Sequence, residues 1–185
     1  MKPCVGIALS VLMLATLVES ACTVLSHAAS LITEENARPG QSDWVLTDPA
    51  DHEVEGYASA TSIQRGEPLR LYIHSTDPMV TVATYRMGWY GGTGARLMRG
   101  GITLPGIRQP MPTPDPVTGL IECQWQVSYT LTTESHDKND WLSGMYLVKL
   151  TGSASGKQSY IIFVVREDAR QSYFLFQSSV TSSQA

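Results

Sequence analysis

The chain contains few charged residues, few cysteines and few histidines for its length. Only 16% of its 185 residues are Asp, Glu, Lys or Arg, and its formal net charge is −4. This mild acidity makes nucleic acid and an anionic membrane surface poor partners. Of the three cysteines, Cys4 and Cys22 lie near the N-terminus. Cys123 then stands alone, so no disulfide framework or zinc site is expected, and we predict that it is a small buried side chain beside Trp125.

Long apolar runs are also scarce, and the main one lies at the N-terminus. Val5–Val18 follows Lys2 and precedes small residues at Ser26–Ala29. The run is shorter than the roughly 20 residues that a transmembrane helix needs. This layout is typical of a secretory signal peptide, so we predict cleavage after Ala28 and export, as a secreted or periplasmic protein.

Two alternatives to this signal peptide stay open. The run could be a buried helix or an uncleaved anchor. Cleavage before Cys22 would give a lipoprotein, although Glu19 fits that signal poorly. Removing residues 1–28 takes away one basic and one acidic residue, Lys2 and Glu19, so the net charge stays at −4.

Short segments with alternating apolar and polar residues fill the middle of the chain. They are Val54–Ile63, Leu69–His74, Met79–Arg86, Val127–Leu131, Met145–Leu150 and Tyr160–Val165. A period of two, with turn residues between the segments, is typical of half-buried antiparallel strands. We therefore predict a mainly β fold, an immunoglobulin-like antiparallel β-sandwich. A barrel with a similar number of strands is the alternative.

The predicted domain organisation has four parts. Residues 1–28 are the signal peptide, 29–43 a polar surface lead-in, 44–168 the β-sandwich, and 169–185 the start of a truncated second domain. Tyr173–Phe176 is apolar on both faces, which is typical of a strand covered on both sides in an α/β sheet. An extra edge strand followed by a disordered tail is the alternative. Five prolines within Pro105–Gly119 exclude a central strand there and predict a stiff insertion.

The most distinctive segment is Tyr85–Gly94, which reads YRMGWYGGTG. Its functional interpretation is a binding surface, with Trp89 and Tyr90 as aromatic platforms and Arg86 as a donor to carboxylate or carbonyl oxygens. Its structural interpretation is a tight corner whose rings pack under neighbouring loops. The segment has neither the lysine nor the spacing of a phosphate-binding loop.

Other polar clusters carry no assigned chemistry. Glu134–Asp140 and Asp51–Glu53 are predicted to be solvated turns, because neither has the spacing of a known metal site. His74 lies on the polar face of a strand, where we expect it to be exposed or hydrogen-bonded. No nucleophile motif is present, so no catalytic residue and no metal ligand is assigned.

Several segments together resemble one known family. Residues 85–96 resemble the YRxGWYGGxGAR segment of the large (β) subunit of N,N-dimethylformamidase. Gly56–Ser59 fits the pattern upstream, Trp141–Tyr146 resembles the W-x-SG-x-Y element, and Phe163–Arg166 with Phe176–Thr181 resembles the domain junction. The order and spacing agree over roughly Trp44 to Ala185.

This resemblance implies an N-terminal β-sandwich followed by a larger, catalytic α/β-type domain. In the characterised amidase, tyrosine and glutamate side chains of that later domain hold a single iron, and none of them can be placed on this sequence. The chain is thus expected to be the non-catalytic N-terminal part of an exported amide-bond hydrolase, inactive by itself. The signal peptide is a departure, because the characterised enzyme acts inside the cell.

Two other functions stay open. One is a secreted module that binds carbohydrate or peptide through Arg86, Trp89 and Tyr90. The other is a purely structural sandwich. The partners expected are the downstream domain of the same protein, with association into homo-oligomers as an open possibility.

Overall fold

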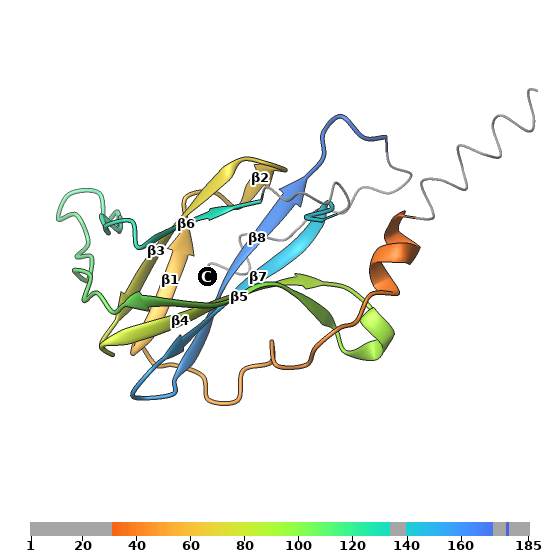
Figure 1. The fold of residues 1–185 in the computed structure, drawn as a ribbon. Helices are drawn as coiled ribbons and strands as arrows, with labels where there is room; N and C mark the ends of the chain where they lie inside the picture. The colour runs from red at the N-terminus through yellow and green to blue at the C-terminus, as the bar shows by residue number, and fades with distance from the viewer. Residues whose placement is uncertain (1–30, 134–139, 172–176, 178–185) are drawn as a thin grey trace, which may run out of the picture. The chain divides into compact units, whose positions relative to one another are not determined.

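The protein is mainly β, with two sheets packed face to face (Figure 1). The structure, a computed structural model, describes residues 31–133, 140–171 and 177. The described part contains a three-stranded sheet in the order β1-β3-β6 and a five-stranded sheet in the order β2-β8-β7-β4-β5. The strands are β1 (Val54–Ala58), β2 (Ser62–Gln64), β3 (Pro68–Ser75), β4 (Met79–Met87), β5 (Ala95–Pro105), β6 (Tyr129–Thr132), β7 (Gly144–Gly152) and β8 (Gln158–Arg166). The predicted sandwich is confirmed.

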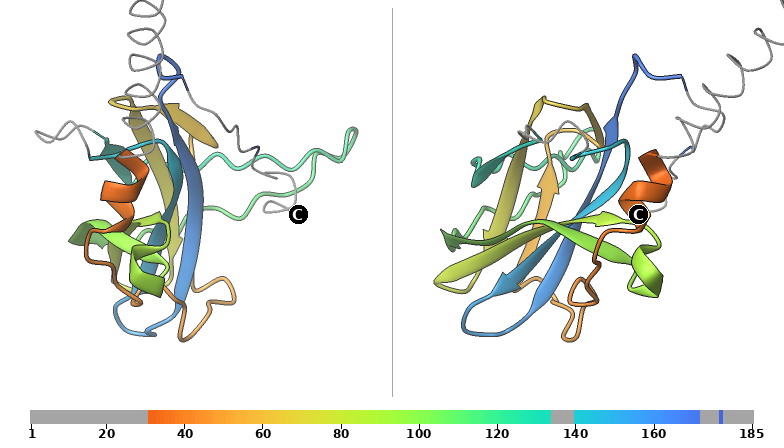
Figure 2. Two further views of the ribbon diagram at one scale, coloured as in Figure 1. Left: turned by 90° about the vertical axis from the view of Figure 1, so that its right-hand side faces the viewer. Right: turned by 45° about the vertical axis from the view of Figure 1, so that its right-hand side comes forward.

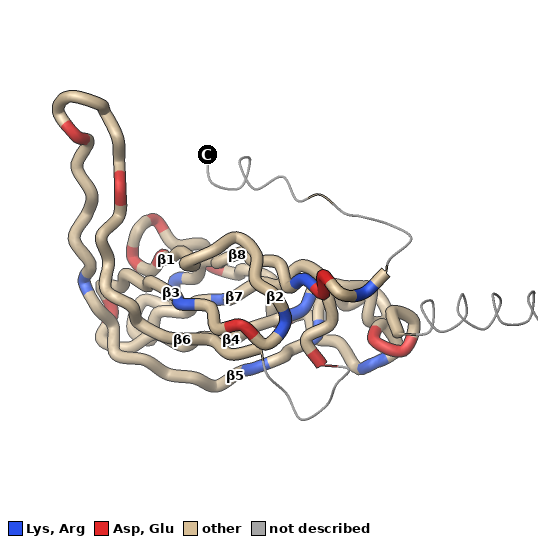
Figure 3. Tube along the Cα trace, turned by 90° about the horizontal axis from the view of Figure 1, so that it is seen from above, with Lys and Arg blue, Asp and Glu red and all other residues tan. Residues whose placement is uncertain are grey.

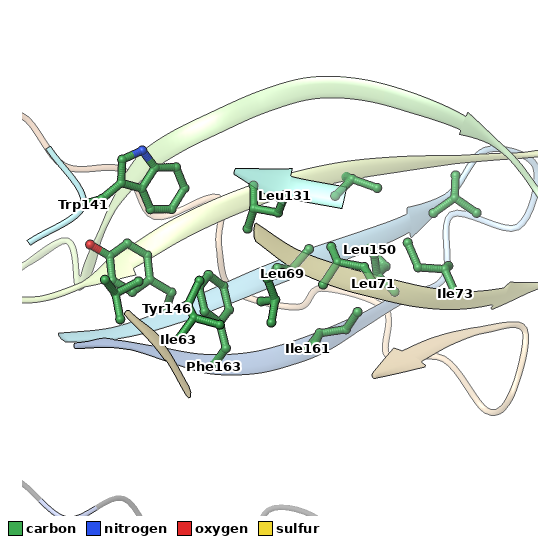
Figure 4. Packing of buried hydrophobic residues seen from close by; sticks show 14 of the residues in the cluster. Ile63, Leu69, Leu71, Ile73, Leu131, Trp141, Tyr146, Leu150, Ile161 and Phe163 are labelled. Atoms are coloured by element: carbon green, nitrogen blue, oxygen red, sulfur yellow. The ribbon is translucent and has the colours of Figure 1, made fainter. Parts of the chain in front are cut away.

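The core forms where the inward faces of the two sheets meet (Figure 4). Leu69, Leu71 and Ile73 alternate along β3 and are all buried. From the other sheet, Tyr146 stacks between Trp141 and Phe163, with ring centroids 5.3 and 5.4 Å away. The period-two pattern thus places large apolar side chains on one face of each sheet, and their burial drives the packing.

Three features of the sheets differ from the prediction. The short pair β2–β8 is parallel, whereas the other ladders are antiparallel. β5 was not predicted, because Gly100 and Gly101 interrupt its alternation, and its pairing with β4 shifts register between Val82 and Tyr85. The predicted strand at Val127–Leu131 begins only at Tyr129.

The described residues before the sandwich include a short helix. The chain divides into two compact units after Arg38, and residues 31–36 of the first are helical. Within this unit Glu35 is buried and pairs with Arg38 at 3.4 Å. The predicted second-domain strand Tyr173–Phe176 lies outside the described residues.

Residues 41–50 cross the outer face of the five-stranded sheet, where side chains from three strands hold them. Lys149 of β7 donates hydrogen bonds to the carbonyl oxygens of Asp43 and Val45, at 2.7 and 2.9 Å. Tyr85 of β4 donates to the Asp43 carboxylate at 3.0 Å, and Tyr160 of β8 donates to the Trp44 carbonyl. Burial lowers the pKa of Lys149 and raises the pKa of Tyr85. This segment therefore seals the sheet from solvent.

A buried carboxylate fixes the hairpin between β7 and β8. Asp77 Oδ2 accepts hydrogen bonds from the backbone N–H groups of Ala154 and Ser155 and from the Ser155 hydroxyl, at 3.1, 2.9 and 2.8 Å. The Ser155 N–H is the main cause that lowers the pKa of Asp77. Gly152 makes this approach possible, because a Cβ there would lie 2.1 Å from Asp77 Oδ2.

We predict that Asp77→Ala lowers the free energy of unfolding at neutral pH by about 1–3 kcal/mol, because it removes charge-assisted hydrogen bonds. Since the pKa of Asp77 is lowered by folding, its stabilising effect is complete above the unfolded-state pKa of about 3.9 and is lost as the pH falls through the folded-state pKa. Urea denaturation at neutral and acidic pH measures both effects. Asp168→Ala, at an exposed ion pair with Arg166, is the control. Equal stability of the two variants at neutral pH would contradict the prediction.

Candidate functional site

The segment Tyr85–Gly94 lies where β4 turns into β5, and the structure separates its three candidate residues. Trp89 is 70% exposed, whereas Arg86 is 5% and Tyr90 2% exposed. Arg86 lies directly opposite Tyr146 in the β4–β7 ladder. Its side chain is therefore on the same, core-facing side of the sheet as the Tyr146 ring. Only Trp89 of the three is therefore presented to solvent as an aromatic platform.

The turn itself is tight and depends on its glycines. A 3-10 helix spans Tyr90–Gly92, and Gly88 N–H donates to the Gly94 carbonyl at 3.1 Å. Gly94 has a φ of +87°, and a Cβ there would lie 2.9 Å from the ring of Trp44. Trp44 in turn donates from Nε1 to the Thr93 carbonyl at 2.9 Å. Glycine is needed both for the left-handed backbone and for this close approach.

The guanidinium of Arg86 is a buried cation that bonds to neutral oxygens. Its Nη1 donates to the Tyr90 hydroxyl at 3.0 Å and to the Met87 carbonyl at 3.4 Å, and its Nη2 donates to the Ser143 carbonyl at 3.1 Å. Among the described residues it has no carboxylate partner, and its buried Nε has no acceptor. A Cβ at Gly144 would lie 3.2 Å from Nη2, so glycine at 144 makes room for the guanidinium.

Ser143 joins this arginine to the end of β8 through three of its atoms. Its carbonyl accepts from Arg86, its backbone N–H donates to Glu167 Oε2 at 3.2 Å, and its hydroxyl accepts from Arg170 at 3.3 Å. Glu167 also pairs with Arg65 at 3.2 Å and with Arg170 at 3.4 Å. The segments that carry the resemblance at residues 85–96, 141–146 and 163–166 thus meet at one end of the sandwich.

This end is rich in charge of both signs (Figure 3). Arg96 of β5 pairs with Asp140 at 3.2 Å, next to the arginines and the glutamate around Ser143. We call the group Arg65, Arg86, Arg96, Asp140, Ser143, Glu167 and Arg170 the Ser143 network. Hydrogen bonds and ion pairs within the network orient the loops at this end of the sandwich. Trp89 projects from the neighbouring turn.

The remaining candidate residues lie apart from this network. His74 is buried, and its Nδ1 lies 3.0 Å from the backbone nitrogen of Gln109, so it is hydrogen-bonded as expected. His52 is exposed and lies 3.1 Å from Glu55 Oε2, a contact that raises the pKa of His52. Glu53 accepts a hydrogen bond from the Asp51 N–H at 2.6 Å, as in an ordinary surface turn. Residues 134–139 of the cluster Glu134–Asp140 lie outside the described part.

The prediction for Cys123 is wrong. It is exposed, because the alternation at residues 123–131 continues beyond the sheet and only β6 is a strand. Trp125 is buried, as its large ring would suggest.

Within the described ranges, no three His, Cys, Asp or Glu residues come close enough to hold a metal ion. In the same ranges, no helix is both long and apolar enough to cross a membrane.

The sequence did not point to Ser143 and Glu167 as parts of a network. The short element Trp141–Tyr146 was the available signal, and its meaning depends on the fold. Trp141 adopts a left-handed φ of +56°, and Tyr146 donates from its hydroxyl to the Leu142 carbonyl at 2.7 Å. These features shape the loop so that Ser143 faces Arg86.

We predict that Arg86→Lys lowers the free energy of unfolding by about 2–4 kcal/mol, because an ammonium cannot bond to the oxygens of Tyr90 and Ser143 in the way a planar guanidinium does. Chemical denaturation measures the change. Arg99→Lys on β5 is the control, since surface substitutions change stability by about 0.5 kcal/mol or less. A stable Arg86→Lys protein would contradict the structural role of Arg86.

The segments that meet at this end lie within the region that matches a known protein family. No curated protein matches the chain. A family described as N,N-dimethylformamidase beta subunit-like, C-terminal, matches residues 81–185, beginning within β4. The matched region is described as C-terminal, which corrects the expectation that the chain corresponds to the family's N-terminal part. The chain belongs to the N,N-dimethylformamidase beta subunit-like family.

Proposed function

We propose that this chain is a non-catalytic part of an exported amide-bond hydrolase related to N,N-dimethylformamidase. In this proposal the sandwich supports and docks the catalytic part through the end that carries the Ser143 network. Iron, if the hydrolase uses it as the resemblance implies, is held by residues of the catalytic part. Export is proposed from the signal-like layout of residues 1–28.

The main support is that the guanidinium of Arg86 makes its hydrogen bonds within the protein. A catalytic or ligand-binding arginine needs donors that reach a substrate, but both terminal nitrogens of Arg86 are bonded to protein oxygens. Tyr90 is equally buried. The most distinctive family segment therefore fixes backbone geometry at one end of the sandwich, as expected of a scaffold.

An assay of amide hydrolysis tests this proposal. We predict that the purified chain releases no dimethylamine from N,N-dimethylformamide above the buffer rate, with or without added iron salts. Mass-spectrometric detection of dimethylamine and formate measures the reaction. Release that rises with the concentration of the chain, and is lost on heat denaturation, would overturn the non-catalytic role.

One observation favours a second function, a binding module for carbohydrate or peptide. Trp89 is 70% exposed at the tip of a rigid turn, and a Cβ at Gly92 would lie only 3.7 Å from its ring. A large ring presented in a fixed position is a common anchor for sugars and apolar side chains, because little conformational entropy is lost on binding. In this alternative Trp89 is the platform, while Arg86 and Tyr90 hold the turn beneath it.

Titration with glycans and peptides distinguishes the two functions. If the chain is a binding module, a ligand changes the tryptophan fluorescence of the wild type, and Trp89→Ala abolishes the change. Met111→Ala, at another exposed apolar residue, is the control. A ligand-induced change that persists in Trp89→Ala would exclude Trp89 as the platform.

A further inference from the structure

The longest loop of the sandwich projects from it as a two-limbed arm (Figures 2 and 3). The arm consists of residues 106–128, between β5 and β6. Gln109 ties its two limbs together at the base, because its side chain donates to the Gln126 carbonyl at 2.9 Å and accepts from the Gln126 N–H at 3.0 Å. Trp125 adds a hydrogen bond from Nε1 to the Pro110 carbonyl at 2.8 Å.

The tip of the arm is also ordered by hydrogen bonds. Asp115 Oδ1 accepts from the N–H groups of Val117 and Thr118 at 3.0 and 2.7 Å, and the Asp115 N–H donates to the Leu120 carbonyl at 2.8 Å. Between base and tip, prolines at 110, 112, 114 and 116 restrict the first limb to extended conformations. An arm fixed at both ends and stiffened between them is preorganised for contact.

The arm exposes apolar side chains that a soluble monomer has no reason to display together. Val117 is 91% exposed, and Met111, Leu120 and Ile121 are each more than half exposed. The arm carries two acidic residues, Asp115 and Glu122, and one basic residue, Arg108, at its base. Its surface is thus apolar, rich in proline and mildly acidic, which indicates a docking element.

The outer face of the three-stranded sheet carries aromatic rings and an arginine, which complement the apolar, mildly acidic surface of the arm. Tyr57 of β1 stacks on Tyr72 of β3 with centroids 4.7 Å apart, and Trp125 from the base of the same chain's arm covers part of this face at 5.3 Å from Tyr57. Both tyrosines are half-buried, so part of each ring reaches solvent. Arg70, two residues before Tyr72 on the same strand, is exposed. In the part of the chain described, its guanidinium has no hydrogen-bond or ion-pair partner.

We propose that the occupant of this aromatic face is the arm of a second copy of the chain, in a symmetric dimer that exchanges arms. Proline-rich extended limbs dock on aromatic side chains. In a two-fold dimer each copy provides one arm and one aromatic face, so the contact is made twice. The exposed carboxylate of Glu122 pairs with Arg70 of the other copy in this arrangement.

The pairing is assigned to two copies because the tip of the arm projects away from its own sheet, although its base contacts that sheet, where Tyr57 donates to the Cys123 carbonyl at 3.2 Å and Trp125 packs 5.3 Å from Tyr57. Its base is fixed by Gln109 and Trp125, and it points outward from there (Figure 2). Glu122 and Arg70 of the same chain are not bonded to each other among the described residues. The dimer thus supplies each unpaired charge with an opposite partner and covers the apolar arm.

Charge reversal with rescue tests this dimer. Sedimentation velocity over a range of protein concentrations should show a reversible dimer of the wild type. Arg70→Glu and Glu122→Lys should each weaken dimerisation by about tenfold, because two-fold symmetry places each changed pair twice in the interface. The double variant, Arg70→Glu with Glu122→Lys, should recover the wild-type affinity, since the two charges are exchanged.

Arg99→Glu on β5 is the matched control, because it makes the same change of charge on the other sheet and should leave dimerisation unchanged. A chain that is monomeric at every concentration would overturn the proposal. So would single reversals that have no effect, which would place a dimer on another surface. Failure of the double variant to recover affinity would overturn the pairing of Arg70 with Glu122. None of these outcomes depends on whether the chain hydrolyses amides.

Discussion

The guanidinium of Arg86 is a permanent positive charge held inside the sandwich, and a buried charge must be given acceptors. Its acceptors come from the turn after β4 and from the loop before β7. Once the Ser143 carbonyl is held there, the other polar atoms of Ser143 face Glu167 and Arg170 beyond β8. A single buried cation therefore links the turn after β4, the loop before β7 and, through Ser143, the residues that follow β8.

This constraint explains the residue types of the family segments. Gly144 makes room for the guanidinium, Gly94 makes room for the ring of Trp44, and the left-handed backbone at Tyr90 brings its hydroxyl to Arg86. We expect such positions to tolerate few substitutions, because a Cβ or a shorter cation would separate buried groups from their hydrogen-bond partners. The YRMGWYGGTG run is thus mainly a structural device, and of its three candidate residues Trp89 is the exposed one.

Alternation predicted the strands whose two faces differ, such as β3 and β8, because burial of one face dictates the pattern. It failed for β5, where paired glycines and a register shift break the pattern, and for Cys123, where the pattern runs on into the arm. The inward direction of Arg86 continues the alternation of Val80, Val82 and Thr84 along β4. An arginine near the end of a strand is normally placed in solvent, however, so we expected it at a binding surface instead.

The arm and the turn that carries Trp89 lie at opposite ends of one strand. β5 begins beside that turn and ends where the arm begins (Figure 1). Its 11 residues, at about 3.3 Å each, separate these ends by roughly 30 Å. The two proposed contacts therefore use different residues. The dimer uses the arm and the outer face of β1 and β3, whereas the catalytic part docks on the Ser143 network.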